Sequence, residues 1–283
     1  MCYKTNDKKI KLNKSYTLHK KEDVIYLSFN KLDNYNWINN SFSTRFGGKS
    51  SGCFYSMNLS NLRDETKEKV DINRKIYANA INAEYNKMVY ALQRHTTNIL
   101  TIDKNNINNN IYNNDFDLDF IDGFITNEKD IVLCTKHADC TPIYLVDTNK
   151  KVIALLHSGW MGTLNNISKN AINIFKEKYN SNPKNIISII GPSICASCFE
   201  IKDDVEQLFL KKDKNYKSNI IKKDNKTYMN LWEINKRNLI NEGLDEENID
   251  IVNLCTKCNP EIFFSHRYHG KDRGGMIATL SII

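Results

Sequence analysis

The chain has 283 residues, 41% of them hydrophobic and 10% aromatic, which is enough apolar side chain to bury the core of one large domain or two coupled halves. Its 40 basic and 33 acidic residues give a formal net charge of +7, a modest value that favours a solvated surface over a nucleic-acid interface. No apolar run approaches the roughly 18 residues of a membrane span, and no export signal is evident. We therefore expect a cytoplasmic protein that binds neither membranes nor nucleic acid.

The first half of the chain alternates between strand and helix patterns. After a polar N-terminal segment over residues 1–22, short apolar runs predict strands at residues 24–29 and 37–43. Apolar residues at mostly three- and four-residue steps predict an amphipathic helix over residues 66–83. Further short apolar runs occupy residues 88–92, 143–146 and 152–156.

The second half continues this alternation, which is typical of a mixed α/β domain. The patterns predict helices over residues 164–175, 199–210 and 231–244, and strands over residues 186–190, 249–254, 262–265 and 276–283. Two polar stretches, residues 105–114 and 211–226, are predicted surface loops or hairpin tips and do not look like domain linkers. We therefore assign residues 23–283 to a single catalytic domain.

Three side chains that can bind a soft metal stand at the ends of apolar runs. They are His95, Cys140 and His157. One thiolate and two imidazoles suit zinc or copper, and three protein ligands leave a fourth position open for water, as in catalytic zinc sites. This pattern favours an enzyme.

Two other interpretations of the same residues stay open. The histidines can be hydrogen-bonded core residues and Cys140 a small buried residue, because their spacing matches no local zinc signature. Alternatively, Cys140 is a nucleophile and His157 its base, as in cysteine hydrolases and amidases, with Asp139 or a nearby carbonyl orienting the imidazole.

Arginine and glycine suggest where an anion could bind. Only seven residues are Arg, and a guanidinium binds oxyanions in a bidentate way. Four of them lie in or beside other candidate segments and could bind an oxyanion: Arg45, Arg94, Arg267 and Arg273. For Arg94 and Arg273, the alternative is that the side chain only ties loops together through backbone carbonyls. Arg45 lies beside Gly47 and Gly48, whose backbone amides are unobstructed and could wrap a phosphate or a ribose. The loop lacks the spacing of nucleotide-binding motifs, and an ordinary β-turn is the alternative.

Two CxxC pairs suggest a second metal site. Cys195 and Cys198 form one pair, and Cys255 and Cys258 form the other. Four thiolates can hold a structural zinc ion, although the pairs are further apart than in common zinc ribbons. Reduced, partly buried thiols are the alternative, and the length of the chain argues against a disulfide scaffold.

A series of motifs over about residues 41–275 resembles a known family. The motifs include Ser43-Thr44-Arg45-Phe46-Gly47-Gly48, Met57-Asn58-Leu59, Gln93-Arg94-His95, Asp122-Gly123, Ala138-Asp139-Cys140-Thr141-Pro142, His157-Ser158-Gly159-Trp160, Gly191-Pro192-Ser193-Ile194 and Phe263-Phe264-Ser265-His266-Arg267. They resemble the polyphenol oxidase or laccase-domain family, now regarded as purine nucleoside phosphorylases with adenosine deaminase and methylthioadenosine phosphorylase activity.

The resemblance implies a layered mixed α/β fold akin to that of cysteine-dependent deamidating toxins, in one compact domain. It implies zinc, or copper, held by His95, Cys140 and His157, and purine nucleosides and phosphate as substrates. It also points to a homodimer. The residues that it implies in substrate or phosphate binding are Arg45, Gly47, Gly48, Asn58, Gln93 and Arg267, and those in catalysis are Cys140, His157, Asp139 and His266. Asp139 and His266 would move the proton in deamination.

The chain departs from the family pattern near these residues. Met161 and Tyr268 stand where the family usually has Arg, and His266 stands where it usually has Tyr. The chain has six histidines in all, too few for the blue-copper site and three-copper cluster of a multicopper oxidase. A hydrolase or amidase acting on cell-wall precursors and a noncatalytic nucleoside-binding regulator remain the alternative functions.

Overall fold

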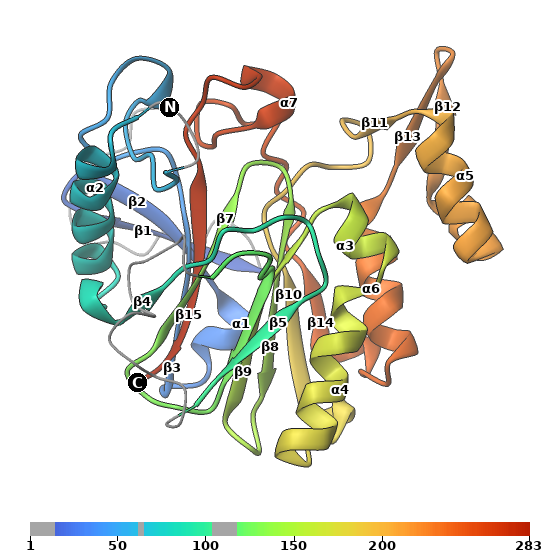
Figure 1. Ribbon diagram of the computed structural model, residues 1–283, viewed down its shortest axis with the longest axis horizontal. Coiled ribbons are helices and arrows are strands. Elements are labelled where there is room, and N and C mark those ends of the chain that lie inside the picture. Colours follow the sequence, from blue (N-terminus) through green and yellow to red (C-terminus); the bar gives the residue numbers. More distant parts are fainter. Residues whose placement is uncertain (1–14, 62–64, 104–117) are drawn as a thin grey trace.

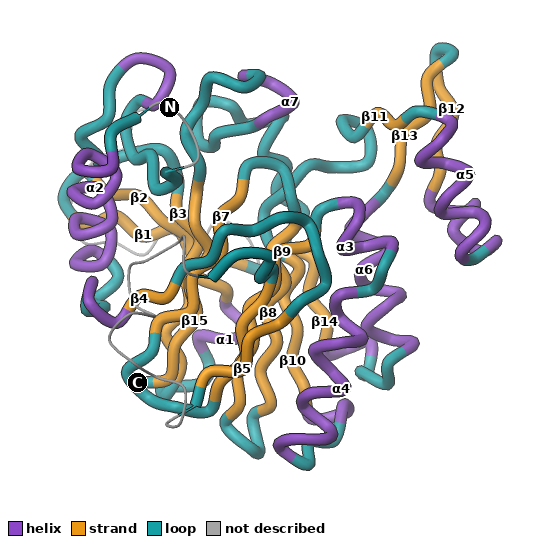
Figure 2. The backbone as a smooth tube through the Cα atoms, in the orientation of Figure 1, coloured by secondary structure: helices purple, strands orange, loops and turns teal. Residues whose placement is uncertain are grey.

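The computed structural model describes residues 15–61, 65–103 and 118–283 (Figure 1). Two sheets of six strands lie between helices on both outer sides (Figure 2). The predicted loop at residues 105–114 lies outside the described residues, as do residues 1–14 of the polar N-terminal segment. Among the described helices, none is both long and apolar enough to cross a membrane.

The first sheet has the strand order β1-β2-β3-β15-β7-β4, and all its neighbours except β4 and β7 are antiparallel. Its strands are β1 (Tyr16–Lys21), β2 (Val24–Phe29), β3 (Ile38–Ser43), β15 (Met276–Ile282), β7 (Val132–His137) and β4 (Met88–Val89). The two ends of the described chain thus lie in the same sheet, because β15 pairs with β3 along most of its length.

The second sheet has the order β14-β10-β8-β9-β6-β5. Its strands are β14 (Ile249–Ile251), β10 (Ile186–Ile190), β8 (Thr141–Asp147), β9 (Val152–Ser158), β6 (Gly123–Thr126) and β5 (Ile99–Ile102). Both faces of its central strands are buried. Alternate residues along each strand point to opposite faces, and a different layer packs on each face. On β8, Tyr144 and Val146 pack between the two sheets, whereas Ile143 and Leu145 pack under the helices.

Helices cover the outer face of each sheet. The helix α2 (Lys67–Ala80) places Tyr77 and Ala78 on the first sheet, beside Cys134 and Ile277. The remaining helices are α1 (Asn30–Asp33), α3 (Trp160–Leu164), α4 (Ile167–Tyr179), α5 (Asp203–Lys212), α6 (Leu231–Asn241) and α7 (His266–His269). Of these, α4 and α6 pack on the second sheet. The result is a fold of four layers, helix, sheet, sheet and helix, which confirms the predicted layered α/β class.

A small sheet, β11-β13-β12, projects from this body together with α5 (Figure 1). Its strands are β11 (Glu200–Ile201), β12 (Ile220–Lys223) and β13 (Lys226–Met229), and Asp224 and Asn225 turn between the last two with positive φ. The predicted hairpin tip within residues 211–226 is therefore present. Short 3₁₀ turns occupy Gly52–Phe54, Tyr85–Lys87, Pro183–Asn185, Lys214–Asn219 and Glu246–Asn248.

Several predicted elements differ from the structure. The single helix expected over residues 164–175 is two helices, because Asn166 adopts a left-handed φ of 54° and its side chain caps α4 by accepting from the Lys169 amide. The helix expected at residue 199 begins at Asp203, because Glu200–Ile201 pairs with β13 instead. Periodicity does not reveal a partner strand that lies so far away in sequence.

Two other boundaries also move. No strand forms at residues 262–265, where Phe263 and Phe264 are buried as anchors of a loop and the Ser265 side chain caps α7. The sequence pattern places residues 16–21 in the polar N-terminal segment, but they form β1 and pair with β2. Charged residues of this strand conceal an alternation in which Tyr16 and Leu18 pack against the core.

Candidate functional site

The three predicted metal ligands meet at one point, although they come from separate segments. His95 lies on the loop that follows β4 and has a positive φ of 62°, Cys140 lies on the loop between β7 and β8, and His157 lies in β9. The pairing of β8 with β9 brings Cys140 beside His157, because Pro142 lies opposite His157 in the register. The three ligand atoms all lie within 4.8 Å of one another, and the Cys140 Sγ is 3.7 Å from the His95 Nε2.

A buried carboxylate, that of Asp122, organises these ligands. It accepts hydrogen bonds from the backbone amides of Arg94, His95 and Thr96 at 3.2, 3.1 and 2.7 Å, which fixes the loop that carries His95. It also lies 2.8 Å from the His157 Nδ1. A proton held on Nδ1 by this carboxylate leaves Nε2 of His157 free to act as a ligand, as in the carboxylate–histidine pairs of zinc enzymes.

The charges of this group favour a thiolate. Burial raises the pKa of the Cys140 thiol, but the charge of His157 and hydrogen bonds from His157 and His95 outweigh burial and lower this pKa to about 6. Burial lowers the pKa of His157, but Cys140 and Asp122 outweigh it and raise the pKa to about 9. Burial also raises the pKa of Asp122, yet its hydrogen bonds with His157 and Thr96 bring that pKa down to about 2. Without a metal, the site therefore holds a thiolate beside an imidazolium at neutral pH.

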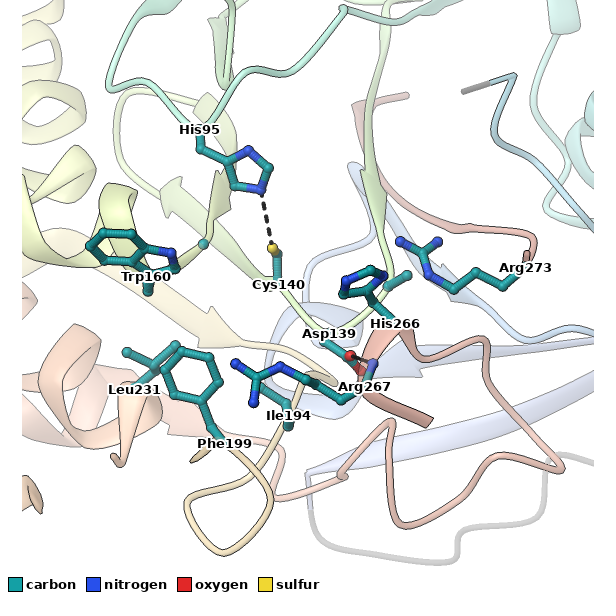
Figure 3. A pocket seen from close by; sticks show the side chains of 12 residues that line it. His95, Asp139, Cys140, Trp160, Ile194, Phe199, Leu231, His266, Arg267 and Arg273 are labelled. Carbon is teal, nitrogen blue, oxygen red and sulfur yellow. Dashed lines mark hydrogen bonds between the residues drawn. The ribbon is translucent and has the colours of Figure 1, made fainter. Parts of the chain in front are cut away.

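Cys140 and His95 open onto a cavity of about 370 Å³. Besides these two, the lining residues are Ala138, Asp139, Gly159, Trp160, Ile194, Phe199, Leu231, His266, Arg267 and Arg273. Figure 3 shows the aromatic side chains of Trp160 and Phe199 on one side of Cys140 and the guanidinium of Arg273 on the other. A mostly apolar wall with a few convergent polar groups is typical of a small-molecule site.

A smaller cavity of about 140 Å³ shares His95, Cys140 and Arg273 with the first. Gln93 lines it, and this side chain also bridges to β7, donating to the Lys136 carbonyl at 3.0 Å and accepting from the Lys136 amide at 2.7 Å. Gln93, predicted to bind substrate, thus lies next to the candidate metal ligands.

Other predicted site residues lie at the large cavity, but their roles differ. His266 and Arg267 line it and are exposed. Asp139 also lines it, yet both its carboxylate oxygens accept hydrogen bonds, from Thr256 Oγ1 at 2.6 Å and from the Arg267 amide at 2.7 Å. This carboxylate therefore holds the loop that carries Arg267, and its expected role as a proton shuttle stays a prediction.

Four predicted substrate-binding residues do not line this cavity: Arg45, Gly47, Gly48 and Asn58. The Arg45 guanidinium donates to the carbonyls of Tyr55 and Pro260 at 2.9 and 2.8 Å and lies over the Phe264 ring. The amides of Gly47 and Gly48 donate to the Ser56 hydroxyl, and the Asn58 side chain is buried in contacts with Glu65 and Gly275. In this structure these residues tie loops together, and their predicted role in substrate binding stays a prediction.

Sequence patterns say little about some residues that shape the site. Asp122 belongs to the Asp122-Gly123 motif, but its partners lie 26 to 35 positions away, so only folding reveals its function. Arg273, one of the four arginines that the sequence marks as candidates to bind an oxyanion, lines both cavities. Trp160 belongs to one of the family motifs, but neither it nor Phe199 has a sequence pattern that predicts its place on the cavity wall.

Residues 39–283 match the family described as "Multi-copper polyphenol oxidoreductase laccase". "Purine nucleoside phosphorylase YlmD" of Bacillus subtilis (strain 168) is 30% identical over 85% of this chain and 87% of its own length. "Adenosine deaminase RL5" of an unknown prokaryotic organism is 28% identical over 83% of this chain and 90% of its own length.

The fold has a close counterpart among solved structures. The crystal structure of the Bacillus licheniformis hypothetical protein YfiH superposes with a TM-score of 0.82 at 24% identity, and the match covers 97% of this chain and 99% of that one. The resemblance inferred from the motifs is confirmed by the family match, which takes in all three candidate metal ligands. The chain belongs to the family described as multi-copper polyphenol oxidoreductase laccase.

Proposed function

We propose that this chain is a purine nucleoside phosphorylase that also deaminates adenosine, with residues 23–283 and β1 forming one catalytic domain. The substrates would be adenosine, inosine or guanosine and S-methyl-5′-thioadenosine, which phosphate converts to a free base and a ribose 1-phosphate. One observation carries the proposal, namely that a trio able to hold a metal opens into a cavity of about 370 Å³ with aromatic and cationic walls. Relatives named for both activities support it.

The trio fits zinc, with copper as the alternative. His95, Cys140 and His157 supply two imidazoles and one sulfur within 4.8 Å of one another, and Asp122 provides the second contact that a metal-bound imidazole usually has. When bound, such an ion supplies Lewis acidity, which would activate water for deamination at C6 of the purine.

The cavity walls suggest how the nucleoside lies. Trp160 and Phe199 offer apolar faces on which a purine can stack, while Arg267 and Arg273 can hold phosphate. The Arg267 guanidinium is oriented by a bond from Nη1 to the Glu200 carbonyl at 2.8 Å and by its place over Phe199. Holding the anion beside C1′ as the ribosyl group becomes cation-like would lower the barrier to phosphorolysis. His266, on the same wall, is our candidate to donate a proton to the departing base.

Product analysis tests this function. Purified protein is incubated with adenosine, inosine and methylthioadenosine, with and without phosphate, and the products are separated by chromatography. We expect hypoxanthine from inosine only when phosphate is present, and inosine from adenosine without phosphate. Tight inosine binding with no turnover would contradict the proposal and favour a noncatalytic nucleoside-binding regulator.

A second candidate is a cysteine hydrolase or amidase that acts on cell-wall precursors. The observation that favours it is the Cys140 thiol beside His157, with a thiol pKa lowered to about 6, mainly by the charge of His157 against the effect of burial. His157 is in turn held by Asp122, as a base is held in a catalytic triad. Activity that resists chelators but is blocked by thiol alkylation would favour this candidate over the metal-dependent one.

A further inference from the structure

The two CxxC pairs come together beyond the ends of two neighbouring strands. They form a cluster distinct from His95, Cys140 and His157. Cys195 and Cys198 lie on the loop after β10, and Cys255 and Cys258 lie on the loop after β14. Because β10 and β14 are parallel neighbours, both loops leave the same edge of the second sheet, and a bridge between Ser193 and Cys255 continues the pairing. The fold thus explains why pairs so distant in sequence meet.

The four sulfurs form a compact cluster. All four Sγ atoms lie within 4.8 Å of one another, and those of Cys198 and Cys258 are 3.4 Å apart. In a tetrahedral zinc site with Zn–S bonds of about 2.3 Å, the sulfurs stand roughly 3.8 Å apart, which agrees with this spacing. We propose that these four cysteines bind a structural Zn²⁺ ion, separate from the metal held by His95, Cys140 and His157.

The backbone around the cluster is arranged for thiolates. The amides of Cys195 and Cys258 donate to the Cys255 Sγ at 3.3 and 3.4 Å, and such bonds stabilise a negatively charged sulfur. Binding would displace the thiol protons to solvent and fill all four positions with sulfur. No position remains for water or substrate, so the ion would act in folding and not in catalysis.

The site would also support one wall of the large cavity. Ile194 and Phe199, which line that cavity, are the immediate neighbours of Cys195 and Cys198. Next to Cys255, Thr256 donates its hydroxyl to Asp139 at 2.6 Å, and the same carboxylate accepts the Arg267 amide. A metal that joins the two loops would therefore hold Phe199 and Arg267 in place, whatever ligand the cavity takes.

Metal analysis of variants without the trio tests the proposal. In the double variant His95→Ala/Cys140→Ala, purified under reducing conditions with zinc supplied, elemental analysis and native mass spectrometry should find about one zinc per chain. Adding Cys198→Ser and Cys258→Ser should abolish this zinc. Adding Cys53→Ser instead should leave it unchanged, because Cys53 is an exposed thiol outside the cluster. None of these measurements uses a nucleoside, so failure here and failure of the proposed activity are distinguishable.

A spectroscopic measurement keeps the proposal testable if the cysteine variants fold poorly. Cobalt substituted into the His95→Ala/Cys140→Ala protein should show intense sulfur-to-metal charge transfer and the visible bands of tetrahedral cobalt with thiolate ligands. Chelation should remove these bands and lower the Tm. A protein that contains no metal, or that contains disulfides among the four cysteines by mass spectrometry when purified with zinc, would overturn the proposal.

Discussion

Asp122 connects two of the three candidate metal ligands through one buried carboxylate. It holds the backbone at His95 and the imidazole of His157, and its side chain is fully excluded from solvent. A carboxylate in this position raises the basicity of the imidazole and fixes the orientation of its ring. The geometry of the candidate metal site therefore depends on a residue outside the three candidate ligands.

Replacing Asp122 with Asn should weaken zinc binding at the trio by about 10–100-fold, the usual effect of losing such a partner. The amide is similar in shape but carries no charge to stabilise His157. The affinity can be measured by competition with a chromophoric chelator. The matched control is Asp119→Asn, because Asp119 is exposed and pairs with the Arg94 side chain. Equal affinities in the two variants would contradict the role given to Asp122.

The lowered pKa of Cys140 predicts a pH dependence of its reactivity. The thiol pKa is about 6, because the charge of His157 outweighs the burial that opposes it, so in metal-free protein the thiolate predominates above that pH. The rate of alkylation of Cys140 by iodoacetamide should be nearly constant from about pH 7 upward and fall as the pH decreases through 6. Peptide mass spectrometry follows this site alone. Exposed Cys53 provides the comparison, and a Cys140 rate that kept rising towards pH 9 would refute the thiolate assignment.

Variants of two arginines distinguish a side chain that binds phosphate from one that only supports the fold. Arg273→Met should raise the KM for phosphate by about 10–100-fold, because a charge-assisted hydrogen bond contributes roughly 1.5–3 kcal/mol. Arg45→Met should lower the Tm but leave the phosphate KM nearly unchanged, because Arg45 bonds to the carbonyls of Tyr55 and Pro260. Initial-rate kinetics at varied phosphate decide this. A raised phosphate KM in Arg45→Met, with little change in Arg273→Met, would instead indicate that Arg45 binds phosphate.

At the scale of elements, the site is assembled from loops that rigid strands carry. Cys140 stands between β7 and β8, and the short turn after β9 leads directly into α3, where Trp160 begins the helix. Gly159 in this turn is required by packing, because an added Cβ would lie 2.7 Å from the His95 ring. The strands are buried on both faces, so they place these loops with little freedom.

The variant Gly48→Ala tests whether the loop at Gly48 has a structural role. A Cβ there would meet the Ser56 carbonyl at 2.2 Å and the Met57 Cα at 2.6 Å, both backbone atoms that cannot turn aside. Gly48→Ala should therefore cost about 3 kcal/mol or more in the free energy of unfolding, measured by urea denaturation. Gly52→Ala is the control: its added Cβ meets open space, so only the left-handed φ of +61° opposes it, at about 1–2 kcal/mol. A Gly48 variant of full stability with impaired phosphate binding would instead support a ligand loop.

At the scale of the whole molecule, the interface between the two sheets forms a core that both sheets share. Leu155 on β9 is fully buried in it, so Leu155→Ala should lower the free energy of unfolding by about 2–5 kcal/mol. Leu208 on α5 is 46% exposed, and Leu208→Ala should change it by no more than about 0.5 kcal/mol. Urea denaturation of both variants measures the contrast. A loss at Leu155 as small as that expected at Leu208 would contradict a tightly packed core between the sheets.

Local pattern alone predicted the elements whose periodicity is clear. The strands at residues 24–29 and 186–190 have the predicted bounds, because their apolar side chains alternate or run continuously where both faces are buried. The failures at β1 and β11 concern strands defined by their partners, since β11 exists only because β13 lies beside it. Long-range pairing leaves little trace in a short segment.

The sequence by itself determined the α/β class, the family and the three candidate metal ligands, because these depend on local side-chain chemistry and on the order of motifs. Only the tertiary structure decided which arginines face the cavity, that Asp122 orients His157 and that four cysteines form one cluster. These features depend on distances between segments that are far apart in the chain. Such distances are set by the pairing of strands and the packing of layers, which no local pattern encodes.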